Sequence, residues 1–110
     1  MFLVTNRLAV NEGWGKELER RFAERAGQIE REPGFIRMCV LRPVLRRKDR
    51  TTGEWTRAEG PGVYQIQTWW ESEEAFWAWT TSESFRAAHK NRPPSEMYAG
   101  PSSMEIHELV

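Results

Sequence analysis

The chain has 110 residues, a length that suits one domain with one hydrophobic core, so we expect residues 1–110 to form a single domain. Its 16 basic and 16 acidic residues cancel, which leaves no overall field that would attract nucleic acid or an anionic membrane surface. No apolar run approaches the roughly 20 residues that a membrane span needs, and the N-terminus carries no secretory pattern. We therefore expect a cytoplasmic protein without membrane insertion and without a nucleic-acid partner.

The first thirty residues predict a strand followed by a helix. Within residues 2–10, the even-numbered positions share one side of a strand, and all of them are apolar except Asn6. Residues 12–32 carry apolar side chains at helical spacing before "EPGF" ends the helix. The buried stripe of this helix comprises Trp14, Leu18, Phe22, Ala26 and Ile29.

Two further strands flank a long charged segment. Residues 35–44 and 62–70 are rich in branched and aromatic side chains, as buried strands are. Between them, residues 45–61 are charged and rich in turn residues, which predicts an extended hairpin tip or a loop. Cys39 is the single cysteine, so an internal disulfide is excluded, and its apolar neighbours predict a position in the core.

Serine residues mark the starts of two short helices. Ser72 precedes "EEAFWAW" (73–79) and Ser82 precedes "ESFRAAHK" (83–90). Each hydroxyl stands before an acidic first turn, the arrangement that caps and stabilises a helix N-terminus. The two helices are thus expected in tandem.

The remaining segments complete an α+β fold. Residues 91–103 form a connection rich in Pro, Gly and Ser, and residues 104–110 alternate like a closing strand. The resulting order β-α-β-β-α-β is that of the ferredoxin-like split βαβ fold, with a four-stranded antiparallel sheet and helices on one face. Because strands this apolar need cover on both faces, we expect a homodimer that packs sheet against sheet as a dimeric α+β barrel.

Asn6 stands out because its amide lies in the middle of an apolar strand face. An amide buried without partners costs on the order of 1–3 kcal/mol. A backbone group or a buried water would satisfy it, and so would an atom of a ligand.

His89 lies one turn after Phe85, on the face that a short helix turns inward. One interpretation is structural, since a cationic imidazole is stabilised at a helix C-terminus. The other is ligation: a neutral imidazole is a competent axial ligand for haem iron, and one histidine suffices there, whereas zinc requires three or four protein ligands. His107 is too isolated to complete a metal set and is interpreted as a surface or interface residue.

Trp79 closes the "AFWAW" helix just before that histidine. A tryptophan in a helix stripe is commonly part of a core, but flat apolar walls also suit a planar ligand. The sequence contains no nucleophile elbow, no phosphate-binding glycine loop and no HExxH motif, so hydrolysis and phosphoryl transfer find no support.

With these residues in place, the chain resembles the IsdG-type haem-degrading monooxygenases, within the wider antibiotic biosynthesis monooxygenase (ABM) superfamily. The resemblance covers nearly the whole chain. It is carried by "NRLAV" (6–10), "ELERRFAERAGQIEREPGF" (17–35), "TWWESEEAFWAW" (68–79) and "SFRAAHKN" (84–91). "PGF" and "WESEEAF" recur widely in the superfamily and support the fold, whereas the combination of Asn, Trp and His is more specific for the activity.

Carried over position by position, the resemblance implies an active site of Asn6, Trp79 and His89, with Phe22 lining the pocket. It implies that His89 binds the haem iron axially and leaves the opposite side open for dioxygen, where Asn6 donates its amide. Trp79 would press against the porphyrin and push it out of plane. Haem would be substrate and cofactor at once, and the products would be iron and an open-chain tetrapyrrole. The electrons would come from an external donor, a reductase or a small reductant, that no residue identifies.

Two alternatives and one departure accompany this resemblance. The chain could be a cofactor-free quinol or polyketide monooxygenase of the same superfamily, or a non-enzymatic haem-binding dimer. The departure is the segment 45–61, which is longer and more basic than the short hairpin that the resemblance implies. Its cations would meet the haem propionates or clasp the partner subunit. They are Arg46, Arg47, Lys48, Arg50 and Arg57.

Overall fold

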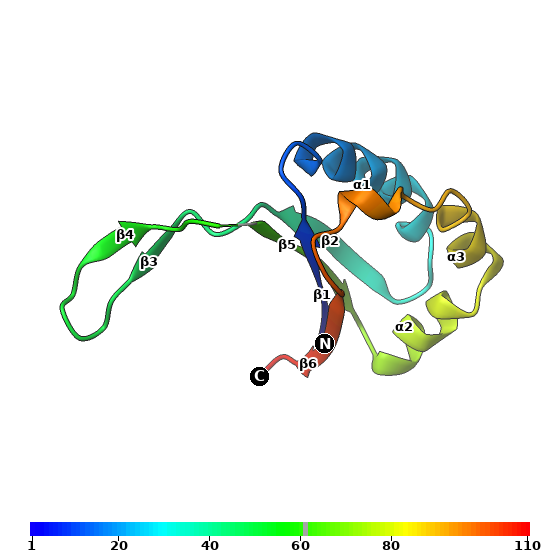
Figure 1. Ribbon diagram of the computed structural model, residues 1–110. Coiled ribbons are helices and arrows are strands. Elements are labelled where there is room, and N and C mark those ends of the chain that lie inside the picture. Colours follow the sequence, from blue (N-terminus) through cyan, green and yellow to red (C-terminus); the bar gives the residue numbers. More distant parts are fainter. Residues whose placement is uncertain (61) are drawn as a thin grey trace.

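A computed structural model describes residues 1–60 and 62–110 as a four-stranded antiparallel sheet with helices on one face (Figure 1). The sheet has the order β2-β5-β1-β6. Its strands are β1 (Phe2–Val10), β2 (Phe35–Leu41), β5 (Gly62–Trp70) and β6 (Ser103–Glu108). The helices are α1 (Gly15–Ile29), α2 (Glu73–Thr80) and α3 (Glu83–Ala88), and a 3-10 turn, η1 (Ser95–Met97), precedes β6. The predicted α+β, ferredoxin-like fold is confirmed.

The helix termini and strand ends differ from the predicted ones where backbone geometry intervenes. The helix predicted over 12–32 begins only at Gly15, because Gly13 adopts a φ of 89° that no right-handed helix accepts. The strand predicted over 35–44 ends at Leu41, two residues before Pro43, which has no N–H for the sheet ladder. The first and third main strands have the expected bounds.

The core fills the space between the sheet and the helices in two adjoining clusters. One gathers around Leu18 and Phe22 of α1, and the other gathers around Trp70, Phe76 and Trp79. Gly34 sets the approach of α2 to the start of β2, since a Cβ built there would lie 2.5 Å from the Cβ of Ala75. Its φ of 82° also favours glycine.

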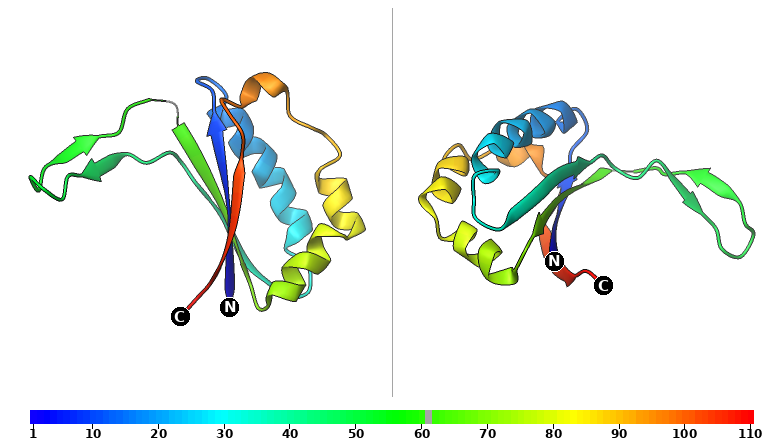
Figure 2. Two further views of the ribbon diagram at one scale, coloured as in Figure 1. Left: turned by 60° about the horizontal axis from the view of Figure 1, so that its bottom comes forward. Right: turned by 180° about the vertical axis from the view of Figure 1, so that it is seen from behind.

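The opposite face of the sheet carries no helix (Figure 2). Because side chains alternate along a strand, this open face presents the odd-numbered residues of β1 and β5, including Thr5, Arg7, Gln65 and Gln67. Arg7 forms an ion pair with Glu105 of β6 there. The open face is therefore more polar than the sequence analysis assumed, and the homodimer stays a prediction.

The predicted core position of Cys39 is wrong. Cys39 is half-buried on the open face, where its Sγ lies 3.8 Å from Oε1 of Gln67, and it is not part of the core. The positions of β2 that pack against the core clusters belong to Met38 and Val40. Alternation along the strand therefore places Cys39 on the far side.

The segment between β2 and β5 forms a projecting hairpin. Its two short strands, β3 (Arg46–Lys48) and β4 (Trp55–Arg57), pair antiparallel with each other and belong to a separate two-stranded sheet. We call residues 42–60 the arm. Figure 1 shows it standing clear of the body, so of the two sequence expectations the extended hairpin is the correct one. Among the described residues, no helix is long and apolar enough to cross a membrane.

Candidate active site

A hollow of about 160 Å³ lies between the sheet and the helices. All four site residues expected from the sequence, Asn6, Phe22, Trp79 and His89, line it. A second hollow, of about 410 Å³, shares Asn6, Phe22 and His89 with the first and extends toward the segment before β6. The structure thus brings together residues that are far apart in the sequence. The walls of the first hollow also include Val4, Arg25, Ile29, Met38, Ile66, Thr68, Phe76, Thr80, Phe85 and Met104.

Asn6 occupies the floor of this site, at the middle of β1. It pairs in register with Ile66 of β5 and Met104 of β6, and both of these residues also line the hollow. Asn6 is half-buried. None of the side-chain hydrogen bonds found among residues 1–60 and 62–110 involves its amide. The amide is therefore available to a molecule that enters the hollow.

Trp79 forms a wall and is held by the junction between α2 and α3. Its side chain is buried and meets the ring of Phe85 edge-on, with the ring centroids 5.3 Å apart. Ser82 ties the junction together: its hydroxyl donates to the carbonyl of Trp79 at 2.7 Å and accepts from the amide of Phe85 at 3.1 Å. The predicted N-cap at Ser82 is confirmed, and so is the one at Ser72.

This junction yields a stability prediction. Ser82→Ala removes both hydrogen bonds and should lower the free energy of unfolding by about 0.5–2 kcal/mol, the usual cost of losing an N-cap. Chemical denaturation measures the change. The matched control is Ser84→Ala, which alters a serine of α3 that forms no cap. Equal stability of the Ser82 variant and the control would contradict the assigned role.

His89 is the C-cap of α3 and lines the hollow at its mouth, where the residue is exposed to solvent. Its Nδ1 lies 2.8 Å from the carbonyl of Phe85, one turn earlier. A carbonyl only accepts, so Nδ1 carries a proton, and in the neutral ring Nε2 is then the nitrogen with the lone pair. The imidazole also stacks on the Phe85 ring, with centroids 3.9 Å apart and planes 26° from parallel. These two contacts fix the tautomer and the orientation of a potential ligand nitrogen.

The surroundings of His89 favour the neutral imidazole. Partial burial lowers its pKa below the ordinary 6.5, the hydrogen bond to Phe85 opposes this shift, and the nearby Arg25 cation reinforces it. Only the neutral form has a lone pair for a metal. The structural interpretation of His89, as a cation stabilised by the helix dipole, is therefore not favoured.

The lowered pKa predicts acid sensitivity of the free protein. The pKa of His89 is lower in the folded protein than in the unfolded chain. At pH values between these two pKa values, His89 is protonated in the unfolded chain and not in the folded protein. The free energy of unfolding therefore decreases as the pH falls through about 6.5. An NMR titration of the His89 ring should give a midpoint below 6.5. In His89→Gln, the stability loss over this pH window should shrink. A midpoint at or above 6.5 would refute the prediction.

Two cations of the site, Arg25 and Arg92, were not predicted from the sequence. Arg25 lines both hollows and lies over the Phe22 ring, with 4.8 Å from its Cζ to the ring centroid. Burial lowers its pKa, although an arginine stays charged at neutral pH. Arg92, in the segment that follows His89, lines the second hollow as well. The signal for Arg25 was its spacing of three residues from Phe22, which places both on one helix face.

The basic arm does not take part in this site. The described residues that line the two hollows include none from 42–60. The arm projects from the open side of the sheet (Figure 2), whereas residues of α1, α2 and α3 line the hollows on the other side. Within one chain, the expectation that arm cations meet the ligand of this pocket is therefore wrong.

Comparisons with known proteins agree with this geometry. The model of the antibiotic biosynthesis monooxygenase family matches residues 1–91. A mycobilin-producing haem oxygenase of Mycobacterium tuberculosis is 37% identical over 105 residues, which cover 96% of this chain and 86% of the relative. A staphylobilin-producing haem oxygenase of Staphylococcus haemolyticus is 35% identical over 101 residues, covering 92% of this chain and 85% of the relative.

A solved structure shows the same likeness in three dimensions. The haem-degrading protein MhuD of Mycobacterium tuberculosis, solved with two haems in its active site, superposes with a TM-score of 0.71 at 34% identity. The match covers 100% of this chain and 96% of MhuD. The chain therefore belongs to the antibiotic biosynthesis monooxygenase family, and within it to the group that holds the haem-degrading relatives.

Proposed function

We propose that this protein is a haem-degrading monooxygenase, which binds haem in the hollow between its sheet and helices and opens the porphyrin ring with release of iron. The observation that carries this proposal is the placement of His89: Phe85 holds its Nδ1 and stacks on its ring, which leaves Nε2 as the candidate ligand nitrogen in a hollow with aromatic walls. The named activity of the relatives, haem oxygenase, supports the same conclusion.

The chemistry of the lining suits haem as a substrate. Phe22, Phe76 and Trp79 offer flat apolar surface to a porphyrin. Arg25 and Arg92 place two cations beside the second hollow, where they would pair with the propionates. Among the described residues there is no group of three or more His, Cys, Asp or Glu that could hold a metal ion. A lone histidine fits the axial position of haem iron, which needs only one protein ligand.

Each site residue then has a distinct role. His89 binds the iron through Nε2 and so fixes which face of the ring stays open. Asn6 donates its amide from the floor of the hollow and orients the oxidant toward one edge of the ring. Trp79 is buried and braced by Phe85, so it presents a rigid wall that would distort a bound porphyrin. Arg25 and Arg92 set the in-plane orientation.

The proposed activity implies an electron donor, and the open sheet face implies a second protomer. Ring opening consumes electrons, which an external donor, a reductase or a small reductant, must supply. We also propose a homodimer formed through the open sheet face, because that face includes Val63 and Leu41, both 42% exposed, beside its polar residues. The cytoplasmic location stays a prediction.

Titration with hemin tests the proposed function. Addition of hemin to the free protein should produce a shifted Soret band that saturates, and ascorbate in air should then remove that band and release iron that a ferrous chelator detects. A Soret shift without ring loss would indicate a haem carrier instead. No Soret shift at all would refute both haem functions and favour a cofactor-free oxygenase.

A further inference from the structure

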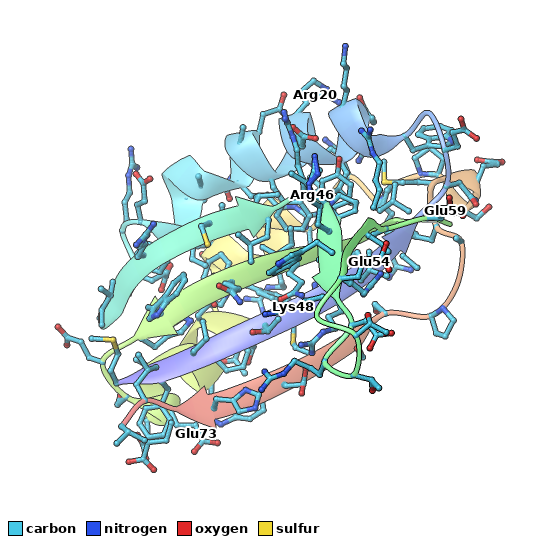
Figure 3. The ribbon with its side chains drawn as sticks, turned by 90° about the vertical axis from the view of Figure 1, so that its left-hand side faces the viewer. Arg20, Arg46, Lys48, Glu54, Glu59 and Glu73 are labelled. Carbon is cyan, nitrogen blue, oxygen red and sulfur yellow. The ribbon has the colours of Figure 1, made fainter. Side chains whose placement is uncertain are left out.

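The arm is the one prominent feature that the proposed chemistry does not use. Residues 42–60 leave the sheet between β2 and β5 and project on the side opposite the helices (Figures 1 and 2). Figure 3, which looks toward the open face, shows Arg46, Lys48 and Glu54 on the arm in front of the sheet. The arm therefore overhangs the face that the proposed homodimer would bury.

The root of the arm is held firmly to the body. Arg42 donates to Glu19 of α1 at 2.9 Å, and the hydroxyl of Tyr64 donates to the same carboxylate at 2.7 Å. These two hydrogen bonds keep the pKa of Glu19 below its usual range. Pro43 packs so closely over Gly62 that a Cβ on Gly62 would clash with its ring. These contacts tie Arg42 and Pro43, at the root of the arm, to the body.

Beyond its root, the described residues of the arm pair with one another. Its ladder consists of three residue pairs, from Arg46 with Arg57 to Lys48 with Trp55. A turn around Asp49 closes the tip. An isolated two-stranded hairpin is marginally stable in water. Leu45 and Trp55 are nevertheless 74% and 62% exposed, so the arm offers apolar surface that a second body would have to cover.

The arm and the open face form one concave surface. A hollow of about 820 Å³ lies between them, lined on the sheet side by Arg7 and Gln65 and on the arm side by Leu45 and Arg46. Because the same hollow touches both surfaces, a molecule that covers the open face also meets the arm.

Charge indicates what that molecule is. Residues 46–57 contain five basic and two acidic side chains, and because the whole chain is neutral, the rest of it carries three more acidic than basic residues. A second copy therefore brings an acidic body to a basic arm. Two-fold symmetry supplies this contact twice, once for each arm.

We propose that the arm clasps a second copy of this chain, packing Leu45 and Trp55 on the partner's body while the two open sheet faces meet. This inference rests on the homodimer of the proposed function and adds the element that secures it. A face-to-face pair without arms would bring two acidic bodies together and bury only the mixed surface of the sheet. The arm adds an aromatic anchor and a complementary charge, the features that dominate binding energy at interfaces.

Sedimentation equilibrium of full-length variants tests the clasp. In the first variant, an Asn-Gly turn replaces residues 46–57. The backbone at the junction should be little disturbed, because the amide of Ala58 already donates to the carbonyl of Leu45 at 3.0 Å. The second variant is Trp55→Ala, and its matched control is Trp77→Ala, which removes a tryptophan of similar exposure from α2. The first two variants should raise the dimer Kd about tenfold or more, and the control should leave it unchanged.

The outcomes separate the clasp from the rest of the account. Hemin binding by each variant reports that the pocket has folded. If the arm-deleted chain dimerises as tightly as the wild type, the clasp is refuted and the homodimer stands. An arm that binds an electron-donor protein instead would also leave the dimer Kd unchanged. In that case, deletion of the arm would slow turnover with the protein donor and leave turnover with ascorbate unchanged. If the wild type is monomeric at all concentrations yet degrades haem, the homodimer and the clasp both fail and the haem chemistry stands.

Discussion

Replacing His89 with alanine is expected to abolish axial coordination of haem and to reduce degradation to the background of free hemin. Among the residues that the structure describes, His89 is the only histidine that lines the hollow, and the hydrogen bond between its Nδ1 and the Phe85 carbonyl leaves Nε2 for the iron. Arg25 and Arg92 cannot replace it, because their side chains carry donors and no lone pair. The absorption spectrum with hemin and the rate of Soret loss under ascorbate measure the two effects.

Two comparisons make this test specific. His107→Ala, which removes the other histidine from exposed strand β6, should leave the spectrum unchanged. Added imidazole should restore an axially ligated spectrum to His89→Gly, since the deleted ring leaves space at the mouth of the hollow. An unaltered Soret band in His89→Ala would show that another group binds the iron.

Replacing Asn6 with alanine is expected to separate binding from turnover. The amide lies on the floor of the hollow and forms no hydrogen bond with another described residue, so its removal leaves no buried partner unsatisfied. Haem affinity should therefore change little. Turnover should fall by roughly 100- to 1000-fold, the usual loss when one preorganised donor is removed from a site of developing charge.

The measurements are the hemin Kd and the single-turnover rate of Soret loss. Asn91→Ala provides the control, because that exposed amide lies two residues beyond His89 and lines neither haem hollow. If Asn6→Ala degrades haem at the wild-type rate, Asn6 takes no part in the chemistry. A parallel loss of affinity and turnover would make it a binding residue instead.

The strands and the helix faces were predictable because their side-chain patterns are simple. Alternation predicted the bounds of β1, the abundance of branched and aromatic residues predicted those of β5, and the apolar stripe of α1 correctly placed Leu18 and Phe22 in the core. Cys39 was misplaced because an apolar run does not reveal which of its residues face the helices, and the register that decides it involves β5. The arm was equally indeterminate, since charged turn-rich segments suit both loops and hairpins.

The candidate site was predictable where a residue conflicted with its surroundings. An amide amid apolar neighbours drew attention to Asn6, and an isolated imidazole beside a tryptophan-rich helix drew attention to His89. Arg25 shows no such conflict, because charged residues on a helix are usually solvated, and only the packing of α1 against the sheet half-buries it. The tautomer of His89 likewise depends on the Phe85 carbonyl, whose position only the fold determines.

Mass spectrometry of the tetrapyrrole after a single turnover tests the central claim most directly. The protein is loaded with one equivalent of hemin and reduced with ascorbate in air, in the presence of catalase to exclude attack by free hydrogen peroxide. The account predicts an open-chain tetrapyrrole that has gained oxygen and lost its iron, formed by the wild type and not by His89→Ala. Recovery of intact haem from the wild type, with its Soret band preserved, would contradict it.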